Sequence, residues 1–306
     1  MRVFLTGATG VIGRRVLRAL IAQGDRVTAI GRTPPAREAL RRAGAEPSAV
    51  GLFDAEALRR AVAGHDAVIN LATHMPSSTA KMLFRGAWRE NDRIRRLASN
   101  LLVDAALAGG ARVFLQESFA PTYPDRGDRW IDETTPIAPA AYNSSVIDAE
   151  AAARRFTAMG GCGVVLRFAA FYGPDARHVV DLARWIRRGW APLPGTPEAY
   201  ISSVSHDDAA SAVLAALQVP AGIYNVADDE PVTRRDYVDS LAAALGAPPP
   251  RLPPAWLGPL MGPVARALGR SLRISNWKLR EAAGWAPRLA SVRVGWPELV
   301  AALAAR

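Results

Sequence analysis

"TGATGVIGRRV", residues 6–16, is the stretch that decides the fold. Its glycines, Gly7, Gly10 and Gly13, separate an apolar run at the N-terminus from a segment with helical apolar spacing. Glycine permits a sharp turn and lets the backbone approach a pyrophosphate, while the first N–H groups of a helix attract the anion. A strand before the glycines and a helix after them predict a dinucleotide-binding loop. The loop residues expected to contact the dinucleotide are Gly7, Thr9, Gly10, Val11, Ile12 and Gly13.

Strand-like apolar runs alternate with helix-like segments through most of the chain. The expected strands are 2–7, 26–32, 48–53, 66–72, 111–118, 163–173 and 222–227. Long helices are expected over 88–108 and 142–159, the second beginning at Tyr142. This alternation predicts an α/β fold, a Rossmann-type doubly wound parallel sheet with helices on both faces. Such a sheet binds ligands beyond the carboxyl ends of its strands.

The pattern loosens after Gly173, where six of the eight tryptophans and a cluster of prolines occur. Tryptophans in a small domain are expected mainly to fill its core. The expected division is a Rossmann domain, 1–172 with 201–226 returning to it, and a smaller, mainly helical substrate-binding cap, 173–200 and 227–306.

The net charge of +10 comes almost entirely from arginine, because Lys81 and Lys278 are the only lysines in the sequence. Many arginines occur in pairs, such as Arg41–Arg42 and Arg95–Arg96, which are spread over several predicted helices and expected on solvated faces. A nucleic-acid binder concentrates its positive charge on one face. We therefore expect a small-molecule substrate and no nucleic-acid partner.

The sequence also indicates the compartment. Cys162 is the single cysteine, so no intrachain disulfide is expected, and the chain fits a reducing cytoplasm. The most apolar late stretch, 242–268, is broken by prolines and arginines, and no membrane span is expected. Neither H-E-x-x-H nor C-x-x-C occurs, so no metal site is expected.

Four further segments support one family resemblance. They are "INLAT" (69–73), "AAYNSSVIDAE" (140–150), "LRFAAFYGP" (166–174) and "ISSVSHDDAASAV" (201–213). Together with the G-x-x-G-x-x-G spacing of the loop, they resemble the extended short-chain dehydrogenase/reductases, the NAD-dependent epimerase/dehydratase family. The resemblance implies a homodimer that pairs the helices over 88–108 and 142–159. It also implies cofactor contacts from Leu52, Leu71, Ala72, Thr73, Tyr142, Phe168 and Ala169.

The resemblance implies Tyr142 and Ser118 as catalytic residues, but the segments that carry them depart from the family pattern. Val146 replaces the lysine of the family's Y-x-x-x-K motif. If Tyr123 is aligned with the family's V-Y-G tyrosine, the position of the catalytic serine falls on Phe119 instead of Ser118. The cofactor loop is therefore intact, whereas the residues that move protons are altered.

The end of the second expected strand bears on the choice of cofactor. NAD-dependent members of this family usually place an acidic residue there, but "AIGRTP" has none and Arg32 follows the strand directly. A guanidinium suits a phosphate dianion. We therefore predict NADP(H) as the cofactor and Arg32 as the ligand of its 2′-phosphate, with Arg14 or Arg37 as helpers.

Without a lysine, Tyr142 is a poor base but a competent acid, because a free phenol with a pKa of about 10 is protonated at pH 7. The expected function is therefore NADPH-dependent reduction of a small organic carbonyl or unsaturated substrate, with Tyr142 as proton donor. Two alternatives stay open: a redox sensor that binds NADP(H) without turnover, and a non-redox enzyme, such as a lyase, cyclase or epimerase, on the same scaffold.

Overall fold

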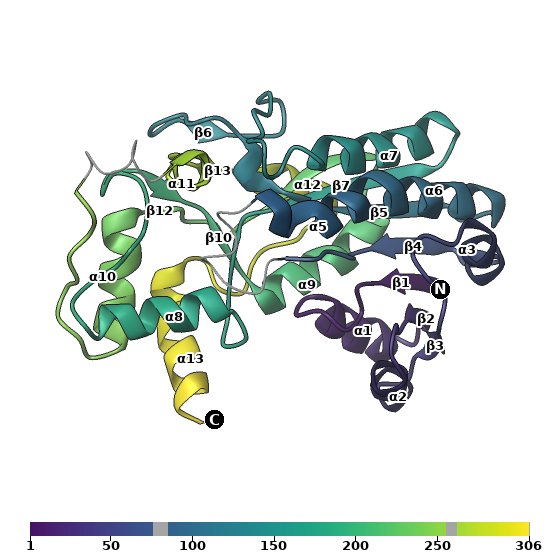
Figure 1. Cartoon of the computed structure of the whole chain (residues 1–306), viewed down its shortest axis with the longest axis horizontal. Helices are drawn as coiled ribbons and strands as arrows, with labels where there is room; N and C mark the ends of the chain where they lie inside the picture. Colours follow the sequence, from purple (N-terminus) through teal and green to yellow (C-terminus); the bar gives the residue numbers. More distant parts are fainter. Residues whose placement is uncertain (76–84, 255–261, 306) are drawn as a thin grey trace.

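A central parallel sheet organises the computed structural model, which describes residues 1–75, 85–254 and 262–305. Within these residues the strand order of the sheet is β11-β7-β5-β4-β1-β2-β3 (Figure 1). The strands are β1 (Arg2–Thr6), β2 (Arg26–Ile30), β3 (Glu46–Ser48), β4 (Ala67–Asn70), β5 (Val113–Phe119), β7 (Cys162–Phe168) and β11 (Gly222–Val226). The Rossmann-type α/β prediction is confirmed.

Helices cover both faces of this sheet, with α1 and α9 on one side and α6 and α7 on the other (Figure 1). The bounds are α1 (Gly13–Ala22), α2 (Pro34–Arg42), α3 (Ala55–Val62), α6 (Ser99–Ala108), α7 (Val146–Ala158) and α9 (His206–Ala215). Side chains alternate along each strand, so in β1 Val3 and Leu5 face α1, whereas Phe4 faces α3 and α6.

The third strand differs from its expected position. The apolar run 48–53 is not a strand, because β3 ends at Ser48 and the chain turns toward the N-cap Asp54 of α3. Leu52 and Phe53 instead pack against a buried cluster that includes Ala72. Tertiary packing therefore takes these apolar side chains out of the sheet.

The expected long helix over 88–108 is a composite. It contains a 3₁₀ turn η1 (Arg85–Trp88), α5 (Arg89–Arg93), a π-helical turn η2 (Ile94–Ala98) and α6. A π-turn inserts an extra residue into the helical repeat and rotates the side chains that precede it, and such turns recur at functional sites. Arg95, on this turn, is 3% exposed, so the prediction that the Arg95–Arg96 pair is solvated is wrong for its first member.

The second long helix begins later than expected. Tyr142 precedes α7 in a turned segment, and the helix starts at Val146. The amide of Asn143 donates to the Ala140 carbonyl, and that of Val146 donates to the Asn143 carbonyl, so three-residue turns replace helical bonds here. Tyr142 therefore lies in a turn that precedes the N-terminus of α7.

The cap has its own apolar core. It is formed by α8 (Arg177–Ile186), α10 (Arg234–Ala244) and α13 (Val292–Ala304), which lie together at one end of the molecule (Figure 1). Trp296 is fully buried there, with ring centroids 5.1 Å from Tyr172 and 5.0 Å from Tyr237. Trp296 thus fills the core of this region, whereas the expectation is wrong for Trp185 and Trp277, which are 44% and 59% exposed.

Short strand pairs and two further helices join the cap to the sheet. The pairs are β8 (Ala170–Tyr172) with β10 (Ser203–Ser205), β9 (Tyr200–Ile201) with β12 (Val232–Thr233), and β13 (Arg273–Ile274) with β6 (Trp130–Ile131). The helices are α11 (Gly262–Leu268) and α12 (Trp277–Ala283), the latter packed on β11. None of the helices in the described part of the chain is long and apolar enough to cross a membrane.

Candidate active site

The glycine loop between β1 and α1 is closely packed. Gly7 has φ +73°, and a Cβ built on it would lie 2.3 Å from the Leu71 carbonyl oxygen at the end of β4. A Cβ on Gly13 would lie 2.1 Å from the Gly7 carbonyl oxygen. Side chains at these two positions would displace the backbone, whereas on Gly10 a Cβ would meet only the Gly7 oxygen, at 3.1 Å. The loop therefore needs glycine where it abuts β4 and α1, as a close pyrophosphate cradle requires.

The other predicted cofactor residues lie at the same edge of the sheet, after the carboxyl ends of the strands. Leu71 and Ala72, after β4, are buried, and Thr73 is exposed. Phe168 ends β7, and Ala169 follows it; both are 1% exposed. The register of β1, β4, β5 and β7 brings these ends side by side. Leu52 is half-buried beside Ala72.

Arg32 is exposed immediately after β2, where the Gly31 amide donates to the Ser48 carbonyl at 2.9 Å. Arg37 lies at the same end of β2, where its Nη1 donates to the Gly31 carbonyl at 3.1 Å. Arg14 pairs with Asp175 of the segment after β8, and its side chain is 41% exposed.

Ser118 belongs to a buried polar network that joins β5, α7, β7 and β11. Its hydroxyl donates to Glu150 Oε1 at 2.6 Å, and the Arg167 guanidinium donates to both Glu150 oxygens at 2.8 and 2.7 Å. Arg167 also donates to the Tyr123 hydroxyl at 2.8 Å, and Tyr123 donates to Asn225 Oδ1 at 2.8 Å. The proton of Ser118 is therefore already used within the protein, and the same network holds Tyr123.

Tyr142 lies in an apolar contact between the two parts of the molecule. Its ring centroid is 5.0 Å from that of Trp88, and Val264 and Ala267 of α11 complete the cluster. Tyr142 is 5% exposed, and its hydroxyl has no hydrogen-bond partner among the described residues. Burial raises the pKa of Tyr142 to about 12, an effect that the positive charges of Arg270 and Arg95 oppose. The phenol is consequently protonated at neutral pH.

Several buried polar atoms on β5, on the helical run 89–98 and in the turn before α7 lack a hydrogen-bond partner within the described residues. Arg95 Nη2 donates to Glu117 Oε1 at 2.7 Å, yet other polar atoms of this region have no partner within the described residues. These atoms are Asn91 Nδ2, Arg95 Nε, Glu117 Oε2, the Tyr142 hydroxyl, both side-chain polar atoms of Asn143 and the Ser145 hydroxyl. Buried polar groups are normally satisfied, so unpartnered atoms of this kind are candidates for contact with a polar ligand or water.

The sequence interpretation missed most of these residues. Only Tyr142 was expected there, since Asn91 and Arg95 belong to no motif and Asn143 was given no role within its segment. The run 89–98 is rich in charged residues, so nothing in the sequence marks Arg95 as buried.

The two histidines expected near the site differ in their exposure to solvent. His74, in the segment after β4, is exposed, and its amide donates to Asn91 Oδ1 at 3.0 Å. His206 is buried at the start of α9, where burial, with Arg15 as a further cause, lowers its pKa to about 4. Lys81 lies outside the described residues. No group of three or more metal-binding side chains was found in the part of the chain that is described.

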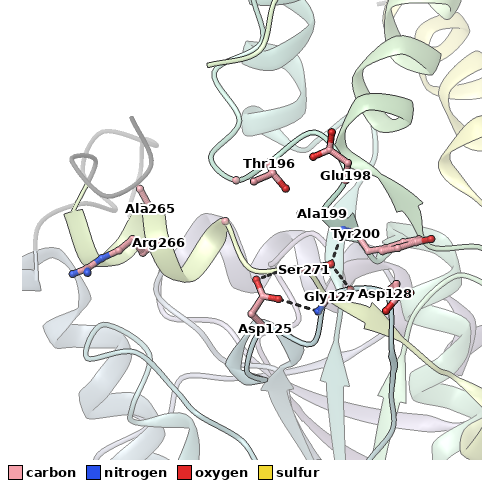
Figure 2. A pocket seen from close by; sticks show the side chains of 12 residues that line it. Asp125, Gly127, Asp128, Thr196, Glu198, Ala199, Tyr200, Ala265, Arg266 and Ser271 are labelled. Carbon is pink, nitrogen blue, oxygen red and sulfur yellow. Dashed lines mark hydrogen bonds between the residues drawn. The ribbon is translucent and has the colours of Figure 1, made fainter. Parts of the chain in front are cut away.

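A cavity of about 480 Å³ opens on the other side of α11 (Figure 2). Ala265 and Arg266 line it from α11, whereas Val264 and Ala267 of the same helix cover Tyr142. The rest of the lining comes from the loops 125–128 and 195–200 and from residues 269–271, and it includes the carboxylates of Asp125, Asp128 and Glu198. Asp125 is held by the amides of Gly127 and Ser271 at 2.9 Å each (Figure 2). Three of the four charged side chains that line the cavity are thus acidic, and the fourth is Arg266.

Comparisons with known proteins agree with this architecture. The model of the NAD dependent epimerase/dehydratase family matches residues 3–227. A 3-diazoavenalumate denitrifying reductase from a Streptomyces species is 34% identical over 309 residues, covering 96% of this chain and 99% of that protein. A 4-hydroxy-2-methyl-3-oxo-4-farnesyl-3,4-dihydroquinoline-1-oxide ketoreductase from Stigmatella aurantiaca is 27% identical, and the match covers 80% of this chain and 74% of that protein.

Among solved structures, the UDP-glucose 4-epimerase of Thermus thermophilus in complex with NAD has a TM-score of 0.77. It is 25% identical, and the match covers 99% of both chains. The family match extends over the whole sheet, including the glycine loop and the segment around Tyr142. The chain therefore belongs to the NAD dependent epimerase/dehydratase family of extended short-chain dehydrogenase/reductases, and it is an oxidoreductase of that family.

Proposed function

We propose that this protein is an NADPH-dependent reductase of a small organic carbonyl or unsaturated substrate, with Tyr142 as the proton donor. The observation that supports the proposal is the Tyr142 hydroxyl, which is buried and has no hydrogen-bond partner among the described residues. A polar substrate beside Tyr142 would satisfy this hydroxyl.

The residues of this chain favour reduction over oxidation. Tyr142, with its pKa raised to about 12, starts in the protonated form that a proton donor needs. The same burial makes the phenolate, which an oxidation would need as base, scarce at neutral pH. A bound reduced nicotinamide would supply the hydride. Ser118, whose proton goes to Glu150, is proposed to assist by holding that carboxylate in place.

The glycine loop and Arg32 support NADP(H) as the cofactor. Because Gly7 and Gly13 have no side chains, the tightly packed loop backbone can approach a pyrophosphate closely. The first turn of α1 has no acidic residue that would repel this anion. Arg32 is exposed at the end of β2, where a guanidinium can pair with a 2′-phosphate. Arg32→Glu is expected to weaken NADPH binding far more than NADH binding, measured by calorimetry. Arg60→Glu, an exposed charge reversal on α3, is the control, and equal losses for both cofactors would remove Arg32 from this role.

The test of the proposed function is a panel of ketones, β-oxo acids and enones, with NADPH consumption followed by absorbance. Tyr142→Phe is expected to reduce the rate with a turned-over carbonyl by about a hundredfold or more, as for a lost general acid. Tyr224→Phe is the matched control, because Tyr224 is also buried but its hydroxyl donates to the Pro220 carbonyl. A Tyr142→Phe variant with the native rate would show that Tyr142 is not the donor. NADPH binding without turnover of any substrate would favour the sensor.

The relative with 34% identity favours a second reaction, because its name specifies a diazo-bearing carboxylate and denitrification. In that reaction a hydride forms a new C–H bond, the C–N bond breaks, and the diazo group leaves as N₂, so no proton is required from the protein. A diazo-substituted carboxylic acid therefore belongs in the substrate panel. Its reduction should survive Tyr142→Phe, whereas carbonyl reduction should not.

Homodimerisation stays a prediction for this chain. Leu97 on η2 and Ile147 on α7 are 43% and 44% exposed, on helices that also share the ion pair between Arg96 and Asp148 at 3.1 Å. We propose that this face pairs with a second copy, and light scattering coupled to gel filtration tests it.

A further inference from the structure

Arg15, near the start of α1, is hydrogen-bonded to the glycine loop. Its Nη1 donates to the Val11 carbonyl at 3.0 Å, and Val11 lies between Gly10 and Gly13 of the loop. The helix begins at Gly13, so Arg15 contacts the loop that precedes its own helix. Because a charged donor forms a stronger hydrogen bond than a neutral one, this contact fixes the orientation of one peptide group of the loop.

The other two nitrogens of the Arg15 guanidinium are bound to carboxylates of two further segments. Nη2 donates to Asp175 Oδ2 at 3.0 Å, and Nε donates to Asp207 Oδ1 at 2.6 Å. Asp175 lies between β8 and the cap helix α8, whereas Asp207 lies in the first turn of α9. Arg15 therefore joins three segments of the chain: the glycine loop, the entry to the cap and the start of α9.

The segment that carries Asp175 is closely packed against α9. A Cβ built on Gly173 would lie 2.3 Å from His206 Nδ1, the first residue of that helix. The side chains of Arg15 and Asp175 are 17% and 15% exposed, so salt screens their attraction less than that of a surface pair. Because α8 follows directly and packs into the cap core, this ion pair connects the cap to the glycine loop.

We propose that Arg15 is a positioning residue for the cofactor: held by Asp175 and Asp207, it fixes the glycine loop through the Val11 carbonyl and couples cofactor binding to the cap. A loop that is already ordered loses less conformational freedom when a dinucleotide binds, which strengthens binding. Asp175 and Asp207 balance the charges of Arg14 and Arg15, so Arg15 acts by holding the loop and not by attracting the cofactor. This inference rests on the proposed function, because it requires the loop to bind the dinucleotide.

Calorimetric measurement of NADPH binding separates positioning from charge attraction. Asp175→Asn removes a negative charge near the loop, so charge attraction alone would make an anionic cofactor bind more tightly. If Asp175 holds Arg15, the same change should instead weaken NADPH binding about tenfold, as for one lost charge-assisted hydrogen bond. Asp181→Asn is the matched control, because Asp181 is a half-exposed acid on α8 that pairs with Arg184 of the same helix, and it should keep the native affinity.

Substitutions of Arg15 complete the binding test. Arg15→Met should weaken NADPH binding about as much as Asp175→Asn does, and the double variant should lose no more, because each single change already breaks the same link. Arg15→Lys keeps the charge but cannot bind three partners with a planar fork, so it should also weaken binding. Arg18→Met, which removes an exposed arginine of the same helix, is the control.

Hydrogen exchange tests the link without substrate and, in its first step, without cofactor. Amides of the loop 7–13 should exchange faster in Asp175→Asn and in Arg15→Met than in the native protein, whereas those of β5 should be unchanged. A variant that was only less stable overall would exchange faster in β5 as well. In the native protein NADPH should slow exchange in α8, and Arg15→Met should abolish this slowing.

The outcomes distinguish this inference from the proposed function. If the native protein binds neither NADPH nor NADH, the proposed function fails and the inference fails with it. If the native protein binds NADPH and Asp175→Asn binds it more tightly, or Arg15→Lys binds it as the native protein does, only the inference fails. It fails equally if loop exchange in Asp175→Asn matches that of the native protein, or if NADPH leaves exchange in α8 unchanged.

Discussion

The ion pair between Arg167 and Glu150 allows a stability prediction with a magnitude. The two side chains are 5% and 0% exposed, and two hydrogen bonds of 2.8 and 2.7 Å join them. Arg167→Met would leave a carboxylate buried without its cation, which costs about 3–5 kcal/mol. With an unfolding entropy of about 2.1 cal/mol/K per residue, the 306 residues give roughly 0.6 kcal/mol/K. The expected fall in Tm is therefore about 5–8 °C.

The assay is equilibrium denaturation and thermal melting of Arg167→Met, Glu150→Leu and the double variant. Because the desolvation cost of a buried ion pair nearly cancels its attraction, the double variant should regain most of the lost stability. Arg112→Met is the control: Arg112 pairs with Asp66 at 3.6 Å on the surface, and its loss should cost less than about 1 kcal/mol. If the double variant loses the sum of the two single losses, the buried pair is not the source of the effect, and the reasoning is refuted.

Three further predictions concern the loop and two buried titratable groups. Gly7→Ala, which places a Cβ 2.3 Å from the carbonyl oxygen at the end of β4, should lower both Tm and NADPH affinity, whereas Gly51→Ala, with open space around it, should change neither. Burial lowers the pKa of His206 to about 4, so its stabilising contribution is present above about pH 6.5 and is lost as pH falls toward 4. Urea melts of the native protein and of His206→Gln at pH 7.5 and 4.5 test this. Between these two pH values the free energy of unfolding should fall less in the variant, by up to about 3 kcal/mol. Burial raises the pKa of Asp228 well above its usual value, so the stability that its protonated carboxyl contributes is lost as pH rises through that raised pKa. Asp228→Asn should therefore be more stable than the native protein at pH 8. A less stable variant would contradict this assignment.

The sheet and the glycine loop could be predicted from the sequence because their determinants are local. Apolar runs mark the buried parallel strands, and the glycines mark a turn that no other residue type fits. The third strand could not be placed in this way, since Leu52 and Phe53 have strand-like character but pack on Ala72 and its neighbours. Tyr142 was assigned to a helix because its neighbours have helical spacing, yet three-residue turns precede α7.

The candidate site was less predictable, because charge alone does not reveal burial. Arg95 and Arg96 are adjacent arginines, and yet one is 3% exposed beside Glu117 while the other pairs with Asp148 on the surface. Their difference follows ordinary helical spacing, in which positions 94, 95, 98 and 99 face inward and 96 and 97 face solvent. A single sequence does not show which of two adjacent arginines faces inward.

The environment of Tyr142 gives a physical reason why a reductase can lack the lysine. A base for oxidation must be deprotonated before the reaction, so it needs a cation that lowers its pKa in the resting enzyme. A proton donor needs stabilisation only as its proton leaves, and the apolar contacts with Trp88 and α11 keep it protonated until then. In the proposed function, Val146 in place of the family's lysine therefore leaves Tyr142 suited to donate a proton and poorly suited to accept one in the resting enzyme. That proposed role is consistent with relatives named as reductases.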